Sequence, residues 1–304
     1  MWRHVTLSSL FSVRRLAYRR QLHLFLAPYL GGTFLLVLLP TLATAALALM
    51  QYRGVGAPRW VGLDNFWRLL ASPLVRLSLR NSLIFVLLAV PLRLAAALTL
   101  ALLLQREGRL FRLSRVAVYV PTIIPEVAYA LIWLWVFNPV YGPLNLLLTW
   151  LRLPAPDWLL QPGTARLAIV IMMSFQMGEG FVVLLAGLQT IPRSLYEAAR
   201  VDGATAWQSF WRITLPLLLP WLLLLTFRDI LASLQNTFTP SYVVTYGGPY
   251  YATMFAPLLI YELAFDFMDL GLAAALLVLV YCVMTLVILG ILGLVRQREA
   301  FYDA

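Results

Sequence analysis

The sequence predicts an all-α, polytopic membrane protein with six transmembrane helices. Of its 304 residues, 62% are hydrophobic and only 12% are charged, and the mean hydropathy is +0.84. These values lie far outside the range of water-soluble chains. Six apolar runs are long enough to cross about 30 Å of hydrocarbon as helices. They lie near residues 24–50, 82–104, 116–138, 166–188, 216–238 and 270–295.

A further apolar run, from Ala252 to Phe265, is too short to be a seventh span and contains Pro257 and Glu262. We expect it to be an interfacial or re-entrant segment on the outer side of the membrane. The first run follows a long basic segment and is too long for the core of a signal peptide, so it is expected to remain as a span. The chain is thus expected to form a single membrane domain over residues 1–304, without a soluble domain or an internal repeat.

The distribution of arginine predicts the orientation of the spans, because segments rich in basic residues stay in the cytoplasm. On one side lie Arg3, Arg14, Arg15, Arg19, Arg20, Arg106, Arg109, Arg112, Arg115, Arg193, Arg200, Arg212, Arg296 and Arg298. Half as many lie on the other, namely Arg53, Arg59, Arg68, Arg76, Arg80, Arg152 and Arg166. Both termini, including the segment 1–23, are therefore predicted to be cytoplasmic. This topology and anionic lipid explain the net charge of +10 without a nucleic-acid partner.

Residues that could support catalysis or bind a metal are scarce. Cys282 is the single cysteine, so it forms no intrachain disulfide and is expected to be a small packing residue. The two histidines, His4 and His23, lie near the N-terminus, and no metal-ligand spacing occurs. The chain also lacks a GxxxxGK[ST] phosphate loop, so it is not expected to hydrolyse ATP itself. A membrane-embedded enzyme is therefore disfavoured.

A polar segment over residues 189–215 separates the fourth and fifth apolar runs and predicts two short helices. Ser194 and Glu197 have the spacing of a capping box at the start of the first helix, and Gly203 supplies a left-handed stop. The second helix has four residues at helical spacing, Trp207, Phe210, Trp211 and Thr214. Such an amphipathic insert is typical of a docking surface for a soluble partner. The alternative is a short loop that packs on its own bundle.

This segment resembles the EAA loop of permease subunits of binding-protein-dependent ABC importers. The matched positions are Glu197, Ala198, Ala199, Asp202, Gly203, Ala204, Phe210, Ile213, Leu215 and Pro216. In that family the loop is a coupling helix that sits in a cleft of the cytoplasmic ATPase. The resemblance therefore implies ATPase coupling by Glu197, Ala198, Ala199, Asp202, Gly203, Ala204 and Phe210.

Motifs in three outer loops extend the resemblance over residues 20–295. Trp60–Phe66 contains a GLxNF element, Phe137–Asn145 contains two Pro-containing elements, and Thr245–Pro249 matches a T-x-GGP element. Each is weak alone because Gly-Pro turns are common. Their order resembles the first permease type of the maltose and glycerol-phosphate carbohydrate-uptake family.

This resemblance implies the type I ABC-importer permease fold, with a core bundle over about residues 70–295, in a prokaryotic cell (inner) membrane. It also implies a second permease, two ATPase subunits that bind ATP and Mg²⁺, and an extracytoplasmic solute-binding protein. This chain would need no cofactor of its own. Transport would proceed by alternating access, with helix bends at Pro121, Pro125, Pro216 and Pro220.

Ionisable residues near mid-depth in the predicted spans mark the interior of the bundle. Arg93, Glu126, Glu179 and the adjacent Arg228 and Asp229 each cost about 2.5–3.5 kcal/mol in hydrocarbon, so each needs a partner or a wet cavity. We expect Arg93 to pair with Glu126 and tie two helices together. Arg228 is expected to be a structural or interface residue.

Two of these spans carry a pattern suited to a hydroxyl-rich solute. A polar, glycine-rich stretch, Phe175–Phe181, interrupts the fourth span, and Asp229, Ser233 and Asn236 share one face of the fifth. Carboxylates and amides bind vicinal hydroxyls, and aromatic rings cover the apolar face of a pyranose. The maltose-type permease carries its sugar site on these segments, which implies a site at Phe175, Gln176, Glu179, Asp229, Ala232, Ser233 and Asn236.

The predicted function is import of a sugar, a di- or oligosaccharide, by a non-enzymatic transport subunit. Glu179 and Ala232 stand where the maltose permease has aromatic residues, so the solute need not be maltose. Glycerol-phosphate or another small polar solute is an alternative within the same class. A secondary transporter would explain the mid-membrane charges but not the EAA segment. Ser233 and Asn236 have a second interpretation, as hydrogen-bonding residues between helices.

Overall fold

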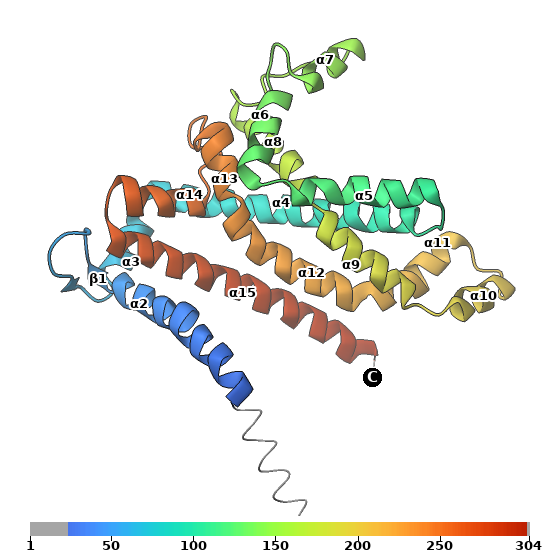
Figure 1. Cartoon of the computed structure of the whole chain (residues 1–304), viewed down its shortest axis with the longest axis horizontal. Helices are drawn as coiled ribbons and strands as arrows, with labels where there is room; N and C mark the ends of the chain where they lie inside the picture. Colours follow the sequence, from blue (N-terminus) through green and yellow to red (C-terminus); the bar gives the residue numbers. More distant parts are fainter. Residues whose placement is uncertain (1–23, 303–304) are drawn as a thin grey trace, which may run out of the picture.

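The computed structural model describes the backbone of residues 24–302, without the side chains of Leu234 and of residues 294–302. Residues 1–23, which include the predicted cytoplasmic N-terminal segment, lie outside the described residues. The described chain is an assembly of helices, with one two-stranded hairpin, β1 (Met50–Gln51) and β2 (Arg59–Trp60). Figure 1 shows the helices as an elongated bundle with α10 and α11 at one end and the hairpin at the opposite end. These are called below the inner and the outer end.

Four helices are long and apolar enough to cross a membrane. They are Leu24–Ala48, Pro73–Leu104 (α4), Ala206–Ser233 and Leu270–Gly293, the last within α15 (Leu270–Tyr302). The first comprises a π-helical turn, η1 (Phe34–Leu38), and α2 (Leu39–Ala48), and the third continues into α12 (Leu215–Asn236). Helix α4 is the second predicted span, and it starts nine residues before the predicted position. Its start is fixed by Ser72, whose side chain accepts a hydrogen bond from the Val75 amide.

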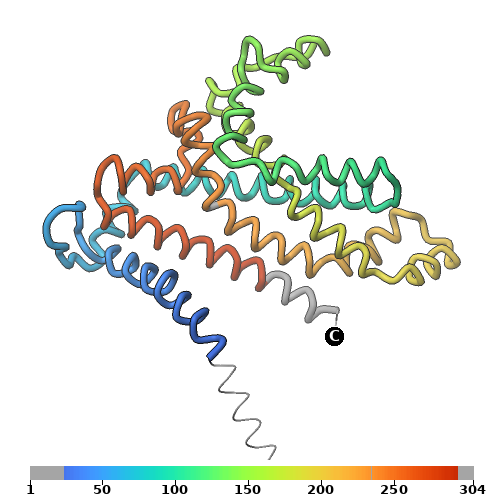
Figure 2. The backbone as a smooth tube through the Cα atoms, viewed as in Figure 1, coloured from blue at the N-terminus to red at the C-terminus, as the bar shows by residue number. Residues whose placement is uncertain are grey.

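Two further spans are bent pairs of helices, which brings the total to the six predicted. Helices α5 (Arg109–Ile123) and α6 (Glu126–Val136) meet at 105°, and α8 (Pro162–Ser174) and α9 (Gly178–Gln189) meet at 48°. The sharper bend lies at Ile124-Pro125, where the residue before proline adopts extended geometry, as sterics favour. Figure 2 shows that α6, α8 and their connection project away from the other helices.

Of the four prolines predicted to bend helices, only Pro125 lies at a break in the described chain. Pro121 lies inside α5 and Pro220 inside α12, and both helices continue through them. Pro216 lies inside the continuous helix Ala206–Ser233, just after the π-helical turn η2 (Phe210–Thr214).

The remaining elements are short. They are α3 (Asp64–Ala71), α7 (Pro143–Trp150), α10 (Arg193–Val201), α11 (Ala206–Ser209), η2 (Phe210–Thr214), α13 (Phe238–Pro240), η3 (Ser241–Thr245), α14 (Ala256–Tyr261) and η4 (Glu262–Asp266). The segment α14–η4 covers most of the apolar run Ala252–Phe265, which is predicted not to span. It is too short to cross a membrane and packs on α4 and α15, with Leu258 and Leu259 buried, which confirms that prediction.

The core consists of two separate clusters of apolar side chains. The outer cluster includes Val90 of α4, Met173 of α8 and Ile230 of α12. The inner cluster includes Ala97 of α4, Phe181 of α9 and Leu225 of α12. The division between the clusters therefore crosses α4, the α8–α9 pair and α12. Between the residues of the two clusters along these helices lie Arg93, Glu179, Arg228 and Asp229.

Asparagines from the outer-loop motifs brace these loops. Asn65 is buried, and its side-chain amide donates hydrogen bonds to the carbonyls of Ala48 and Met50, at the end of α2. Asn145 accepts a 2.7 Å hydrogen bond from the indole N–H of Trp158 and donates to the loop backbone. These motifs therefore have a structural role that their composition alone did not reveal.

Helix α2 lies at the edge of the bundle and packs mainly on α15. A groove of about 900 Å³ separates the two helices. Cys282 lines this groove and is exposed, so the prediction that it is a packing residue is wrong for the isolated chain. The reason is geometric: the groove follows from the divergence of two helices, which the sequence of either one does not encode.

Candidate functional site

The first part of the candidate site is the polar insert at the inner end, which begins with α10. The structure contradicts the predicted Ser194–Glu197 capping box. Pro192 is the N-cap, and no side chain caps the helix. Proline at this position fixes the backbone entry angle, which moves the start of the helix two residues earlier than the serine pattern indicates. Glu197 is left exposed on the helix surface and free to contact a partner.

Gly203 ends α10 as predicted. Its φ is +77°, a left-handed conformation that glycine adopts without steric cost. The Gly203 amide donates to the Arg200 carbonyl, and the Ala204 amide donates to the Ala199 carbonyl at 2.8 Å. These two bonds form a Schellman motif, which satisfies the last carbonyls of α10 and reverses the chain direction.

Thr205 starts the second helix of the insert with a capping box. Its hydroxyl accepts from the Gln208 amide, and the Gln208 side chain accepts from the Thr205 amide. The Tyr196 and Thr214 hydroxyls, 2.8 Å apart, join the two helices. Three aromatic rings form a cluster on the second helix, with centroids 5.4–6.0 Å apart: Trp207, Phe210 and Trp211. Trp207 is 68% exposed, so the cluster presents an apolar surface at the inner end.

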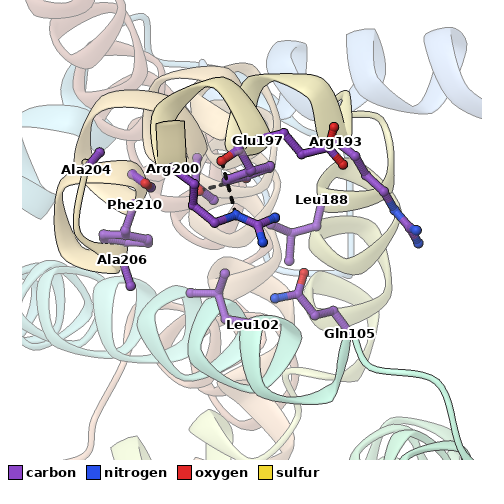
Figure 3. Close-up of a pocket in the computed structure, with 12 residues that line it drawn as sticks. Leu102, Gln105, Leu188, Arg193, Glu197, Arg200, Ala204, Ala206 and Phe210 are labelled. Atoms are coloured by element: carbon purple, nitrogen blue, oxygen red, sulfur yellow. Dashed lines mark hydrogen bonds between the residues drawn. The ribbon is translucent and has the colours of Figure 1, made fainter. Parts of the chain in front are cut away.

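Two cavities flank this insert, and Figure 3 shows the larger one. The larger has a volume of about 810 Å³ and lies between the insert and the inner ends of α4 and α9. Its wall includes Glu197, Ala204 and Phe210 from the predicted coupling set. A second cavity of about 410 Å³ is lined by Ala199, Asp202, Gly203 and Ala204. The remaining predicted residue, Ala198, is exposed outside both cavities.

The second part of the candidate site is a charged layer between the two apolar clusters. Arg228 of α12 forms an ion pair with Glu179, and its other nitrogen lies 3.4 Å from the Asp229 carboxylate. Asp229 in turn lies 3.6 Å from Nη1 of Arg93 on α4. Arg93 and Asp229 are buried, whereas Glu179 and Arg228 are about half exposed. We call these four residues the charge layer.

The predicted Arg93–Glu126 pair is wrong. Arg93 pairs with Asp229, and Glu126 instead accepts a 2.9 Å hydrogen bond from the Thr239 hydroxyl. The 105° bend after α5 explains the difference, because it points α6 away from α4. The predicted depth of Glu126 in the membrane assumed that its span is a straight helix, and the bend makes that assumption wrong.

The other predicted solute residues differ in accessibility. Phe175 is 50% exposed and stacks at 5.3 Å on Trp133, next to the break between α8 and α9. Gln176, Ala232 and Asn236 are half-buried. Ser233 is buried, and its hydroxyl donates to the Asp229 carbonyl within the same helix.

The break at Phe175–Met177 lets α9 start against α5. A Cβ atom on Gly178 would lie 2.3 Å from the Thr122 hydroxyl oxygen, so only glycine fits at this contact. Glu179 follows in the first turn of α9, where the helix dipole favours a negative charge. The arrangement presents a carboxylate, a guanidinium and amide groups at mid-bundle.

Sequence reasoning located both carboxylates of the charge layer but missed the pairing of Asp229 with Arg93. The available signal was that Arg93 and Asp229 both fall near the middle of their apolar runs. With four charges of balanced sign, the layer carries no net charge, which is how buried charge is tolerated in a low-dielectric interior.

A multi-pass bundle with a charged layer at mid-depth and an exposed two-helix insert at one end defines a membrane transport subunit. The comparisons identify the family. Residues 93–300 match the binding-protein-dependent transport system inner membrane component family, and the chain belongs to it. It is therefore a permease subunit of the ABC-importer class.

The sequences of related permeases align with most of this chain. A probable ABC transporter permease protein of Bacillus subtilis is 32% identical and covers 91% of this chain and 89% of its own length. The lactose transport system permease of Rhizobium radiobacter is 33% identical over 81% of this chain and 83% of its own. A permease chain from the crystal structure of a bacterial alginate importer, 23% identical, has a TM-score of 0.78 over 93% of this chain and 98% of its own. The last comparison shows that the fold is that of type I importers.

Proposed function

We propose that this permease translocates a neutral sugar, a di- or oligosaccharide, delivered by an extracytoplasmic binding protein. The observation that carries this proposal is the charge layer together with the residues beside it. Phe175 offers an exposed ring, Gln176 and Asn236 offer amides, and Glu179 offers a carboxylate. Rings and hydrogen-bonding groups of this kind suit a pyranose with vicinal hydroxyls. The relative from Rhizobium radiobacter transports lactose, which supports the same class of solute.

Charge balance favours a neutral sugar over an anion. Two arginines and two carboxylates cancel within the charge layer, so no excess positive charge is available for a phosphate or carboxylate ligand. A glycerol-phosphate solute would have to displace Glu179 from Arg228 and leave that carboxylate without its partner.

The test is uptake by the assembled importer in proteoliposomes, with its binding protein supplied from outside. Lactose, maltose, trehalose and glycerol 3-phosphate are compared at equal concentration, and calorimetry measures their affinity for the binding protein. We expect uptake of at least one neutral sugar and none of glycerol 3-phosphate. Uptake of glycerol 3-phosphate alone would overturn the proposal.

The importer would comprise this chain, a second permease and two ATPase subunits that bind ATP and Mg²⁺. The insert α10–α11 would dock in a cleft of one ATPase and move with it. Three observations support this docking: Glu197 is exposed, the aromatic cluster at Trp207 is exposed, and the turn at Gly203 is rigid. Closure of the ATPase dimer would then open the bundle outward, and hydrolysis would return it.

The inner end would face the cytoplasm, together with both termini. Arginines support this orientation, because Arg106, Arg109, Arg193 and Arg200 gather at the inner end with α10 and the start of α5. The outer end, with the β1–β2 hairpin, would face the binding protein.

A further inference from the structure

A track of five aromatic rings lies beyond the charge layer, toward the outer end. Its members come from two segments that are apart in sequence. Phe238, Tyr242 and Tyr246 belong to α13, to η3 and to the residue after η3, and Tyr261 and Phe265 belong to α14 and η4. Neighbouring ring centroids are 5.0–5.5 Å apart. The rings therefore form one continuous surface, which we call the aromatic track.

The track is open rather than buried. Tyr242 is 37% exposed, Tyr246 is 56% exposed and Phe265 is 64% exposed. Ring faces that stay open on a closely spaced row are available to a ligand.

Hydrogen bonds hold the loop that connects the two segments of the track. The Ser241 hydroxyl donates to the Thr253 carbonyl at 2.5 Å, and the Thr253 hydroxyl donates to the Gly248 carbonyl at 2.7 Å. Asn81 of α4 donates to the carbonyls of Tyr251 and Met254, which fixes the same loop to the bundle. The track is thus preorganised, and a ligand would lose little free energy in ordering it.

Two carboxylates alternate with the rings. Glu262 follows Tyr261, and Asp266 follows Phe265. Within the described part of the chain, neither forms an ion pair. Asp266 is close enough to the track to be the main cause of a raised pKa at the Tyr246 hydroxyl. These carboxylates are therefore acceptors without a cationic partner, and they would repel an anionic ligand.

Open aromatic faces beside free carboxylates match the surface of a neutral sugar. The C–H bonds of a pyranose face carry partial positive charge and stack on the negative face of a ring, while its hydroxyls donate to carboxylates. The track also starts two residues after Asn236, the last predicted solute residue of α12. A sugar leaving the track would pass Asn236 on its way to the charge layer.

We propose that the aromatic track is an outer sugar-binding station, which holds the solute between its release from the binding protein and its entry to the charge layer. This inference rests on the proposed function, in that the solute is a neutral sugar. It adds a second binding site on the same path, built from Tyr242, Tyr261, Phe265 and the carboxylates of Glu262 and Asp266.

The first experiment measures protection of the track. In the assembled importer, Tyr246→Cys is introduced with Cys282→Ser, and its labelling by a membrane-impermeant maleimide is timed with rising lactose, maltose or trehalose. We expect the transported sugar to slow labelling. Adding Tyr242→Leu is expected to raise the half-protective concentration about two- to tenfold, as the loss of one stacking ring implies. The matched control, Phe267→Leu, removes a ring that is 66% exposed but outside the track, and should leave protection unchanged.

The second measurement is the number of sugars transported per ATP hydrolysed. We expect Tyr242→Leu and Phe265→Leu to lower this ratio while ATP hydrolysis stays at the wild-type rate, because released sugar escapes before it enters the bundle. If a sugar that the wild type transports gives no protection, the station is refuted while the proposed function stands. If no sugar is transported, both fall together. Loss of the second permease from purified Tyr242→Leu importer would show that the track is a subunit interface instead.

Discussion

A buried charge in a bilayer costs free energy, and for Arg93 that cost is offset by a single carboxylate, that of Asp229. Only its Nη1 atom lies near Asp229, at 3.6 Å, while Nε and Nη2 have no hydrogen-bond partner among the described residues. The pair is therefore poorly satisfied, and Arg93 depends on Asp229 alone, whereas Asp229 also lies 3.4 Å from Arg228. Removal of one partner leaves an uncompensated buried charge, which costs more than loss of the pair as a unit.

This dependence predicts a non-additive effect on stability. Asp229→Leu alone should destabilise the protein by about 3–5 kcal/mol, because Arg93 is left charged and buried. The double change Arg93→Met with Asp229→Leu should recover most of that loss. Thermal unfolding of the detergent-solubilised importer measures both. Equal destabilisation by the single and double variants would contradict the pairing.

The half-exposed pair of Glu179 and Arg228 predicts an effect on transport rather than on folding. Glu179→Leu should lower uptake by more than about tenfold, since it removes a hydrogen-bonding group and leaves Arg228 with Asp229 as its only carboxylate partner. Glu179→Gln should retain partial uptake, because the amide still accepts hydrogen bonds. Glu107→Leu, a change in the loop between α4 and α5, is the control. Wild-type uptake by Glu179→Leu would show that the solute path lies elsewhere.

At the scale of elements, the insert α10–α11 derives its shape from backbone chemistry. Pro192 starts it, the Schellman turn at Gly203 reverses it, and the Thr205 capping box restarts it. The nine-residue helix α10, which would be unstable alone, is thereby held against the start of the long helix Ala206–Ser233. The Thr205 capping box of the structure and the Ser194–Glu197 capping box expected from the sequence predict different effects of substitutions on the stability of the insert.

Thr205→Ala should destabilise the insert by about 1 kcal/mol, whereas Ser194→Ala should have almost no effect, because only Thr205 caps a helix. Hydrogen exchange of the insert amides in the purified importer measures the difference. Faster exchange after Ser194→Ala than after Thr205→Ala would restore the capping box expected from the sequence.

Gly203→Ala tests the turn itself. A side chain at φ +77° costs about 1–2 kcal/mol, so the insert should lose its fixed geometry. We expect solute-stimulated ATP hydrolysis to fall while the chain still inserts in the membrane. The control is Gly163→Ala, at an exposed glycine in the first turn of α8 where an added Cβ atom meets open space. Stimulation at the wild-type level in Gly203→Ala would exclude a coupling role for this turn.

At the scale of the whole molecule, the two core clusters and the charge layer divide the bundle into an outer and an inner half. The breaks in the third and fourth spans lie near the same level, at Pro125 and at Phe175–Met177. Packed clusters resist deformation, so relative motion of the halves would concentrate at the breaks and the charge layer. This division suits a subunit that exposes its interior alternately to either side.

Orientation is predicted by the arginine distribution and can be measured on intact cells. In a Cys282→Ser background, Ser194→Cys should react with an impermeant maleimide only after the membrane is breached. Tyr250→Cys should react from outside, because this side chain is 88% exposed at the outer end. The opposite labelling pattern would reverse the topology and the cytoplasmic assignment of both termini.

Local sequence chemistry by itself determined the membrane class, the six spans, the left-handed turn at Gly203 and the polar interruption at Phe175. Each of these depends on neighbouring residues: apolar length, a missing Cβ atom or a run of polar side chains. Tertiary structure decided that Arg93 pairs with Asp229 and not Glu126, that α6 turns away from α5, and that Cys282 lines an open groove. It also brought together the aromatic track from two segments. These contacts join residues far apart in the chain, and helix bends and crossing angles set them, so no local pattern encodes them.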